Sequence, residues 1–194
     1  MSNDDEKSKI IKLGLISQSS IDVYNIFSTF FEKEKLSYNI RDQNHYEFNL
    51  KNTPELTILL NHFKENIDNT PKYIDYKFFL IFINIEDINS LDYLDKIIEN
   101  IFEANNYNNN KKYYIFGFFE NNEKYRINEE KLFAIMDSIG IDYIYYKIKN
   151  NDFDSFKYNI KFIINDCNTI MTEQFLELKH NELVDDSHSK CYIF

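Results

Sequence analysis

The last four residues carry the most specific chemical signal in the sequence. The chain ends Cys191-Tyr192-Ile193-Phe194, with a cysteine fourth from the end, an aliphatic residue third and a phenylalanine last. This arrangement matches the CaaX box that prenyltransferases modify at the cysteine, and a terminal phenylalanine favours geranylgeranyl over farnesyl. We therefore predict that a protein geranylgeranyltransferase modifies Cys191.

The residues before this box determine how firmly the lipid would hold the protein to a membrane. A single prenyl chain gives reversible binding, and stable anchoring usually needs a second lipid or a basic segment. Here Asp185 and Asp186 stand where basic residues would help. We expect the protein at the cytoplasmic face of a cellular membrane, together with a soluble cytoplasmic pool.

The other reactive side chains do not form a recognisable site. The four histidines are scattered: His45, His62, His180 and His188. None has the spacing of a metal-ligand pair. Glu129 and Glu130 fit the start of a solvated helix, and Cys167 falls on the apolar side of an expected helix, which favours a core position. We predict no catalytic residue and no metal ligand.

Length and charge exclude several classes of protein. A chain of 194 residues is long enough for one well-packed domain. The formal net charge of -10 argues against a nucleic-acid partner, which would require a basic patch or stripe. Two cysteines do not make a disulfide framework. The acidic start is unlike a signal peptide, and no apolar run approaches the ~20 residues that cross a bilayer.

Short apolar runs alternate with segments of helical period, which is typical of an α/β fold with a mostly parallel sheet. We expect strands over 9–16, 77–85, 112–119 and 142–149, and an antiparallel edge hairpin formed by 45–50 and 55–60. We expect helices from about residue 20, over 90–103, over 128–139 with Gly140 as a left-handed cap, and from about 153 to 171.

This order of elements resembles that of the Ras-like small GTPases, and of their Rab branch most of all, from Lys9 to Ile164. KLGLISQSSIDVYNIF has the frame of the family's first strand, phosphate loop and first helix. FINIEDINSLDYLDKIIENI is similar to its fourth strand and third helix, and YYIFGFFENN to the strand before its guanine-reading loop.

The resemblance implies a Ras-like fold with a six-stranded, mostly parallel sheet, one antiparallel edge hairpin and helices on both faces. It also divides the chain into a disordered acidic N-terminus over 1–8, a degenerate G domain over 9–172 and a flexible tail over 173–194.

The nucleotide-binding residues of the family are mostly replaced. In the phosphate loop, G-x-x-x-x-G-K-[ST], the lysine neutralises phosphate charge and the hydroxyl ligates magnesium. Gly14 matches the first glycine, whereas Ser19, Ser20 and Ile21 stand at the other three positions. Asp22 adds a carboxylate where a phosphate would dock. The resemblance therefore assigns only Gly14 to a nucleotide site.

Two further motifs of the family are also altered. The magnesium motif D-x-x-G-Q corresponds to Asn61–Glu65, and the base-reading N-K-x-D corresponds to Phe118–Asn121. The first change removes the charge that a hard cation needs and the glutamine that orients water in GTP hydrolysis. We expect no catalysis and no cofactor, with GTP or GDP and magnesium relevant only if binding has survived.

Three functions remain open. The first is a prenylated, membrane-associated Ras- or Rab-related protein that serves signalling or vesicle traffic as a binding module, with weak or no GTP binding. The second is a divergent small GTPase that still binds GTP or GDP and cycles slowly. The third is an unrelated α/β domain with a chance CaaX ending. The replaced residues Ser19–Ile21 and Asn61–Glu65 favour the first function over the second.

Overall fold

A computed structural model describes residues 9–36, 38–42, 45–49, 56–63, 76–104, 110–120 and 127–189. The expected acidic N-terminus over 1–8 and the CaaX box lie outside this part. The strands are β1 (Lys9–Ser17), β2 (Tyr38–Asp42), β3 (His45–Asn49), β4 (Leu56–Phe63), β5 (Phe78–Asn84), β6 (Lys112–Phe119) and β7 (Asp142–Lys149). The helices are α1 (Val23–Glu34), α2 (Ser90–Ala104), α3 (Glu129–Ile139) and α4 (Phe153–Ser189).

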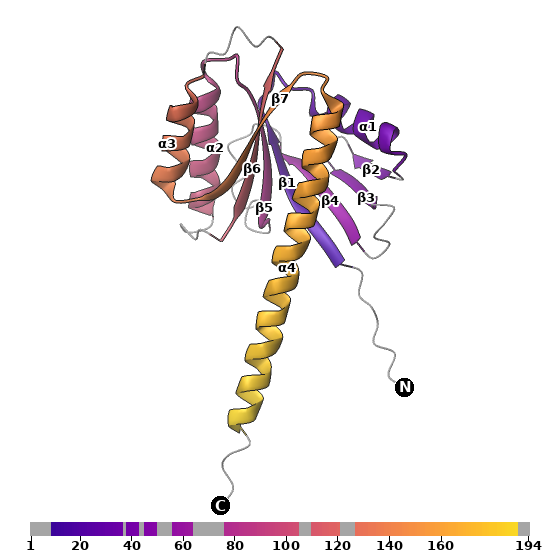
Figure 1. Ribbon diagram of the computed structural model, residues 1–194, viewed down its shortest axis with the longest axis vertical. Helices are drawn as coiled ribbons and strands as arrows, with labels where there is room; N and C mark the ends of the chain where they lie inside the picture. The colour runs from indigo at the N-terminus through magenta and orange to yellow at the C-terminus, as the bar shows by residue number, and fades with distance from the viewer. Residues whose placement is uncertain are drawn as a thin grey trace, which may run out of the picture. The chain divides into compact units, whose positions relative to one another are not determined.

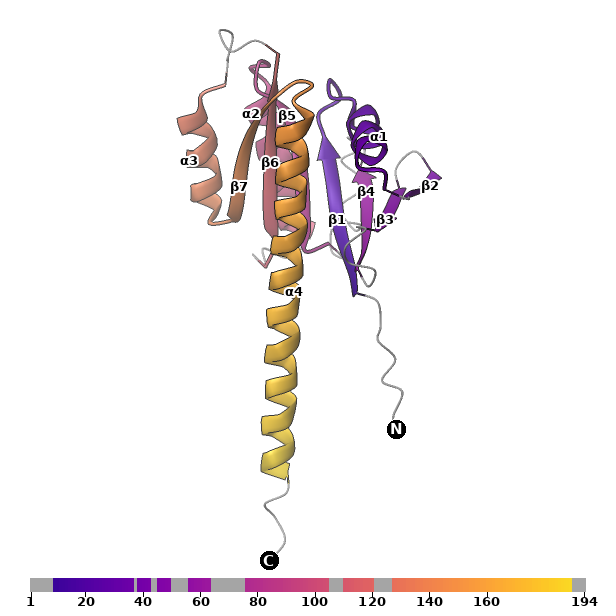
Figure 2. The same cartoon turned by 45° about the vertical axis from the view of Figure 1, so that its right-hand side comes forward.

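The described strands form one sheet in the order β2-β3-β4-β1-β5-β6-β7, with β2 and β7 at its edges (Figure 2). Strands β4, β1, β5, β6 and β7 pair in parallel. Strand β3 is antiparallel to β4, and β2 is antiparallel to β3. The protein is thus α/β with a five-strand parallel sheet. The expectation of six strands is wrong, because β2 adds a seventh at the edge.

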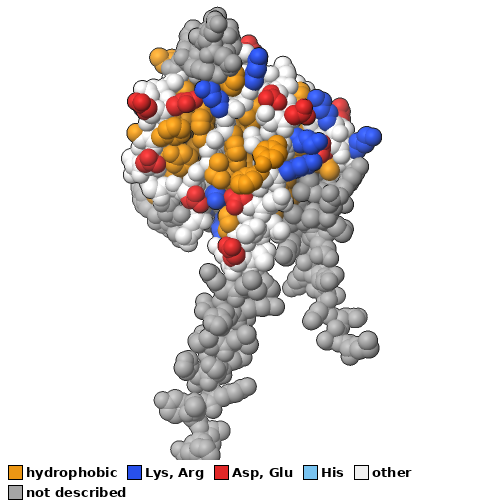
Figure 3. All heavy atoms as spheres, in the orientation of Figure 1, with side chains coloured by type: hydrophobic (Ala, Val, Ile, Leu, Met, Phe, Trp, Pro, Cys, Tyr) orange, Lys and Arg blue, Asp and Glu red, His pale blue; other side chains and the backbone are white. Residues whose placement is uncertain are grey.

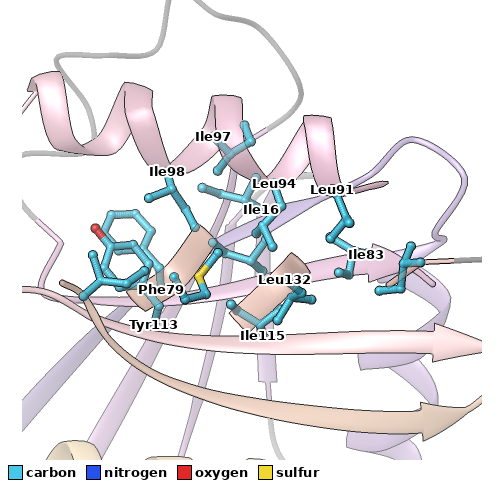
Figure 4. Close-up of a cluster of buried hydrophobic side chains, with 14 of the residues drawn as sticks. Ile16, Phe79, Ile83, Leu91, Leu94, Ile97, Ile98, Tyr113, Ile115 and Leu132 are labelled. Atoms are coloured by element: carbon cyan, nitrogen blue, oxygen red, sulfur yellow. The ribbon is translucent and has the colours of Figure 1, made fainter. Parts of the chain in front are cut away.

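Helices α2 and α3 cover one face of this sheet (Figure 1). In α2 the side chains Leu91, Leu94, Ile98 and Ile101 are buried, at the i, i+3, i+4 spacing of one helical face. Figure 4 shows labelled side chains of α2 directed toward those of β5 and β6. Burying such side chains contributes roughly 1.5–3 kcal/mol each, so this cluster is a main source of stability.

The opposite face of the sheet carries an aromatic cluster that includes helix α1. The ring centroid of Phe27 in α1 lies 6.1 Å from that of Phe82 in β5 and 5.6 Å from that of Phe156 in the first turn of α4. Phe82 in turn lies 4.9 Å from Phe116 in β6. Because both faces are covered, β5 is buried almost throughout, which explains its continuous apolar sequence.

Capping residues set the ends of helices α1 and α3. Helix α1 begins at Val23 rather than near residue 20, because the Asp22 side chain accepts a hydrogen bond from the Asn25 backbone N–H. Helix α3 begins after the Asn128 cap and ends at Gly140, whose φ of 66° is left-handed. The predicted role of Gly140 is therefore confirmed.

The chain divides into two compact units, Met1–Lys157 and Tyr158–Phe194. Helix α4 starts in the first and continues through the second to Ser189. The predicted helix end at 171 is wrong, because no glycine or proline interrupts 153–189 and the helix continues. Residues 173–189 of the predicted tail are therefore helical. In the second unit Cys167 is buried, as predicted for a core residue.

Candidate functional site

A cavity of about 440 Å³ opens in the first unit, at the carboxyl ends of β5, β6 and β7 and beside the loop that follows β1. Open α/β sheets bind their ligands at this edge, where neighbouring connections leave to opposite faces. The lining residues are Ser20, Ile21, Asp22, Asn25, Ile26, Asn84, Glu86, Phe118, Glu120, Ile148, Lys149, Asn150, Asn151, Asp152, Phe153 and Phe156.

The loop from β1 to α1 is held by the side chain of Gln18, which is only 6% exposed. Its Oε1 accepts hydrogen bonds from the Asn84 backbone N–H at 2.9 Å and from Ser90 Oγ at 2.9 Å. Its Nε2 donates to Asp87 Oδ2 at 2.8 Å. A single carboxamide thus joins this loop to the turn between β5 and α2.

Backbone donors of the same loop are also engaged within the protein. The N–H of Gln18 donates to the Phe82 carbonyl, and the N–H of Ile21 donates to the Gln18 carbonyl. Asp22 Oδ1 accepts from Asn25 N–H at 3.0 Å. Anion-binding loops instead direct such N–H groups toward the ligand.

A second wall is built where β5 and β6 end. The Asn84 side-chain Oδ1 accepts from the Glu86 N–H at 2.9 Å, which shapes the turn after β5. Glu86 Oε2 accepts from the Glu120 N–H at 3.2 Å, and Asn150 Nδ2 donates to Glu120 Oε1 at 3.4 Å. These bonds bring two carboxylates from separate strands to one side of the cavity.

The third wall is the turn from β7 into α4. Asn151 has a φ of 67°, a left-handed conformation that asparagine tolerates better than most residues. Asp152 then caps α4, with Oδ1 accepting from Ser155 N–H at 3.1 Å and Oδ2 from Ser155 Oγ at 2.8 Å. The hydrogen bond from the Ser155 hydroxyl is the main reason that the pKa of Asp152 is lowered.

The floor of the cavity is apolar. Phe118 and Phe156 are buried, with ring centroids 6.4 Å apart. The ammonium group of Lys33 lies 4.0 Å from the centroid of the Phe153 ring, which is a cation–π contact. The cavity therefore combines aromatic surface with polar walls.

The charged side chains described in the cavity walls are mostly negative. Within the part of the chain that the structure describes, the lining residues include four carboxylates and one cation: Asp22, Glu86, Glu120, Asp152 and Lys149. Two helix N-termini, those of α1 and α4, also face this space, and their partial positive charge is offset by their own capping aspartates. This arrangement disfavours an anionic ligand.

The structure separates residues that the sequence aligned to one nucleotide site. Gly14 lies inside β1, where its Cα pairs with those of Asn61 in β4 and Phe79 in β5. It does not line the cavity, whose nearest loop starts four residues later at Gln18. Gly14 thus lies in the strand expected over 9–16, which extends one residue further to Ser17, and the other residues aligned to the phosphate loop follow it.

The other aligned motifs are only partly described. Phe118 lines the cavity and Phe119 is buried at the end of β6. Lys64, Glu65 and Asn121 lie outside the described residues, as does Cys191.

The sequence singled out Asp22 but not the other carboxylates that line the same cavity, Glu86, Glu120 and Asp152. These three residues follow different strands or turns, and they come together because those strands end at the same edge of the sheet. No local sequence pattern indicated the role of Gln18, because its hydrogen-bond partners are 66 to 72 positions away in the sequence.

Side chains able to bind metal do not gather within the described part of the chain, where no three histidine, cysteine, aspartate or glutamate residues form a plausible group. Nor does any helix there have the length and apolar character needed to cross a bilayer. No known protein family matches the sequence, and no curated protein is significantly similar to it.

Proposed function

We propose that this chain is a Ras-like domain that works as a binding module without a nucleotide cycle and carries a geranylgeranyl group on Cys191. The sheet supports the Ras-like part of this proposal. Five parallel strands with an antiparallel strand beside β4 is the arrangement that the resemblance implies. Strand β2 is then an addition beyond that edge.

The charge of the cavity is the observation that carries the nucleotide-free part of the proposal. A nucleoside di- or triphosphate brings several negative charges, and among the described lining residues it would meet the carboxylates Asp22, Glu86, Glu120 and Asp152 and the ammonium group of Lys149. Like charges repel, and a partly enclosed site screens this repulsion less than bulk water does. GTP or GDP with magnesium does not fit these residues, so we derive no hydrolytic step.

The hydrogen bonds of Gln18 also support a domain that works without a bound nucleotide. In a phosphate-binding loop the ligand supplies the acceptors that hold the loop. Here the Gln18 carboxamide and the Asp22 carboxylate supply those contacts from within the chain. The domain can therefore keep its loop ordered with no bound anion.

The membrane part of the proposal rests on the CaaX box alone. Helix α4 reaches Ser189, two positions before Cys191. The transferase would act on this short terminal segment, and the lipid would bring the domain to a membrane reversibly. The domain would then offer its surface to protein partners there.

A titration with a fluorescent guanine nucleotide tests the proposal, in magnesium and in a chelated control. We expect no magnesium-dependent affinity tighter than micromolar, in a preparation whose cooperative unfolding shows that it is folded. Tight, magnesium-dependent binding would overturn the proposal and favour a divergent GTPase.

A further inference from the structure

Strand β7 forms one edge of the sheet, and its side chains are less covered than those of the strand beside it. Among the described strands its one neighbour is β6, with which it pairs in parallel from Asp142 to Lys149. Strand β6 is buried along almost all of its length, whereas residues 143–146 of β7 are half-buried. A strand in this position offers its outer side to another strand.

The opposite edge of the sheet carries features that discourage such pairing. Strand β2 has five residues and includes Arg41 and Asp42, and its pairing with β3 is irregular between Ile40 and Asp42. Short, charged and irregular edge strands resist the addition of another strand. Strand β7 has eight residues, pairs with β6 without irregularity and contains neither glycine nor proline. Of the two edges, β7 is therefore the one suited to strand addition.

The backbone of β7 directs its polar groups alternately toward β6 and toward the outer side. Asn150, which follows the strand, donates its N–H to the Phe119 carbonyl of β6 at 2.7 Å. Even-numbered residues of β7 therefore turn their backbone groups toward β6, because the direction alternates along a strand. Tyr143 and Lys149 are odd-numbered and turn theirs to the outer side. An antiparallel strand added there would form its hydrogen bonds with odd-numbered residues.

Aromatic side chains extend this edge onto helix α3. The Phe133 ring is 37% exposed, and its centroid lies 6.5 Å from that of Tyr143 and 5.9 Å from that of Tyr145. Figure 3 shows hydrophobic side chains on the face of the first unit that carries α3 and β7. Aromatic residues are enriched at the centres of protein interfaces. The edge thus joins outward backbone groups to an aromatic surface.

We propose that β7 pairs with β7 of a second copy of this chain, antiparallel about a two-fold axis at Tyr146, so that two sheets become one. Such an axis stands perpendicular to the sheet and keeps each face on its own side, so even-numbered residues lie opposite even-numbered ones. In this register Ile144 lies opposite Ile148 of the second copy, and Tyr143 lies opposite Lys149. The inference does not depend on the proposed function.

The sequence of β7 is self-complementary in this register, which is why the partner is a second copy. On one face, isoleucine lies opposite isoleucine, and apolar cross-strand pairs stabilise a sheet. On the other face each lysine lies opposite a tyrosine, which keeps like charges apart and allows cation–π contacts. Every such pair occurs twice in a two-fold dimer. The strand also carries one aspartate and two lysines, so this edge is not acidic although the chain has a net charge of -10.

Sedimentation equilibrium of the full 194-residue chain tests the proposal. We expect a reversible dimer with a dissociation constant on the order of 10 μM, as is usual for a small interface. Ile144→Lys should weaken the dimer on the order of a hundredfold, because an apolar pair is lost twice. The matched control is Ile10→Lys, which makes the same change of charge at a position of β1 that is 45% exposed. It should dimerise as the unmodified chain does.

A cross-linking experiment tests the register without depending on Ile144→Lys. In a Cys191→Ser background, Tyr146→Cys places two thiols on the two-fold axis. The paired Cα atoms would lie about 4.5 Å apart at this position, within the range that a disulfide spans. Mild oxidation should therefore give a covalent dimer. Ile88→Cys in the same background is the control, since Ile88 is 68% exposed but lies away from β7.

Three outcomes decide the matter. A dimer that Ile144→Lys weakens, Ile10→Lys keeps and Tyr146→Cys traps would support the inference. If Ile144→Lys fails to unfold cooperatively, trapping by Tyr146→Cys alone, with none by Ile88→Cys, would support it. A monomer up to about 200 μM, twentyfold above the expected dissociation constant, would overturn it. A dimer that Ile144→Lys leaves unchanged and Tyr146→Cys does not trap would also overturn it, because the contact would lie on another surface.

Discussion

Gln18 Nε2 lies 2.8 Å from Asp87 Oδ2, a bond that joins the first loop to the turn before α2 across 69 positions of sequence. The same side chain accepts from the Asn84 N–H and from Ser90 Oγ. Ser90 itself is fully buried. One carboxamide therefore satisfies donors and an acceptor that lie largely out of water.

Replacing Gln18 with leucine should destabilise the domain by about 1–3 kcal/mol. The substitution leaves the part-buried Asn84 N–H without its acceptor, whereas the Ser90 hydroxyl also donates to the Asn84 carbonyl. One unsatisfied group of this kind costs about 1–3 kcal/mol. Urea unfolding measures the change, and Glu99→Gln on the exposed side of α2 is the control. A loss below about 0.5 kcal/mol would show that the Gln18 bonds do not hold the loop.

Gly117 in β6 should not tolerate alanine. A Cβ atom there would lie 2.6 Å from Ile85 Cγ2 and 2.6 Å from the Tyr145 hydroxyl oxygen. Overpacking of this kind costs about 1–3 kcal/mol. Adding Tyr145→Phe should recover part of the loss by removing one of the two clashes, with Tyr145→Phe alone as the reference. Full stability of Gly117→Ala would mean that the side chains of Ile85 and Tyr145 move aside at little cost.

Asp152 should make a contribution to folding stability at the N-terminus of α4 that is lost in acid. Its pKa is lowered in the folded state, chiefly by the Ser155 hydroxyl. A lowered carboxyl pKa stabilises the fold above the unfolded value of about 3.9, and that contribution is lost as pH falls through the folded value. Ser155→Ala should therefore raise the pKa of Asp152 and reduce stability at neutral pH, with a smaller difference in acid.

Carboxyl NMR and urea unfolding at two pH values measure these changes. Ser138→Ala is the control, because the Ser138 hydroxyl donates to the Ile135 carbonyl and not to a carboxylate. An unchanged pKa of Asp152 in Ser155→Ala would refute the assignment of its cause.

Cys191 should carry the lipid that determines membrane association. Each CH₂ of a buried acyl or prenyl chain contributes about 0.8 kcal/mol, which suffices for reversible binding. Cys191→Ser should move the protein to the soluble fraction without changing its unfolding, and Phe194→Ser should shift the lipid toward farnesyl. Mass spectrometry of the C-terminal peptide reports both. An unmodified terminus from cells with active transferases would show that the box is a coincidence.

Element order could be predicted from the sequence because each element carries its own pattern. The doubly apolar run of β5 and the glycine that ends α3 are local signals, and both are confirmed. Strand β2 was missed, since YNIRD is short and mixed and becomes a strand by pairing with β3. The extension of α4 was missed because polar composition over 173–189 suggested a flexible tail.

The candidate site was less predictable for a related reason. The strand expected over 9–16 matches β1 to within one residue, but the alignment to a phosphate loop joined Gly14, which lies inside that strand, to residues of the loop that begins at Gln18. The carboxylates of the cavity lie on turns far apart in sequence, and each alone fits an ordinary cap or solvated turn. They lie close together because of the order of the strands in the sheet, which no local segment of the sequence reveals.

Native mass spectrometry of the intact chain, purified in magnesium without added nucleotide, tests the central claim most directly. Small GTPase domains that depend on their nucleotide retain it, since binding stabilises the folded state. We predict a folded protein whose mass equals that of the chain and its lipid alone. Stoichiometric GDP or GTP on the folded protein would contradict the account.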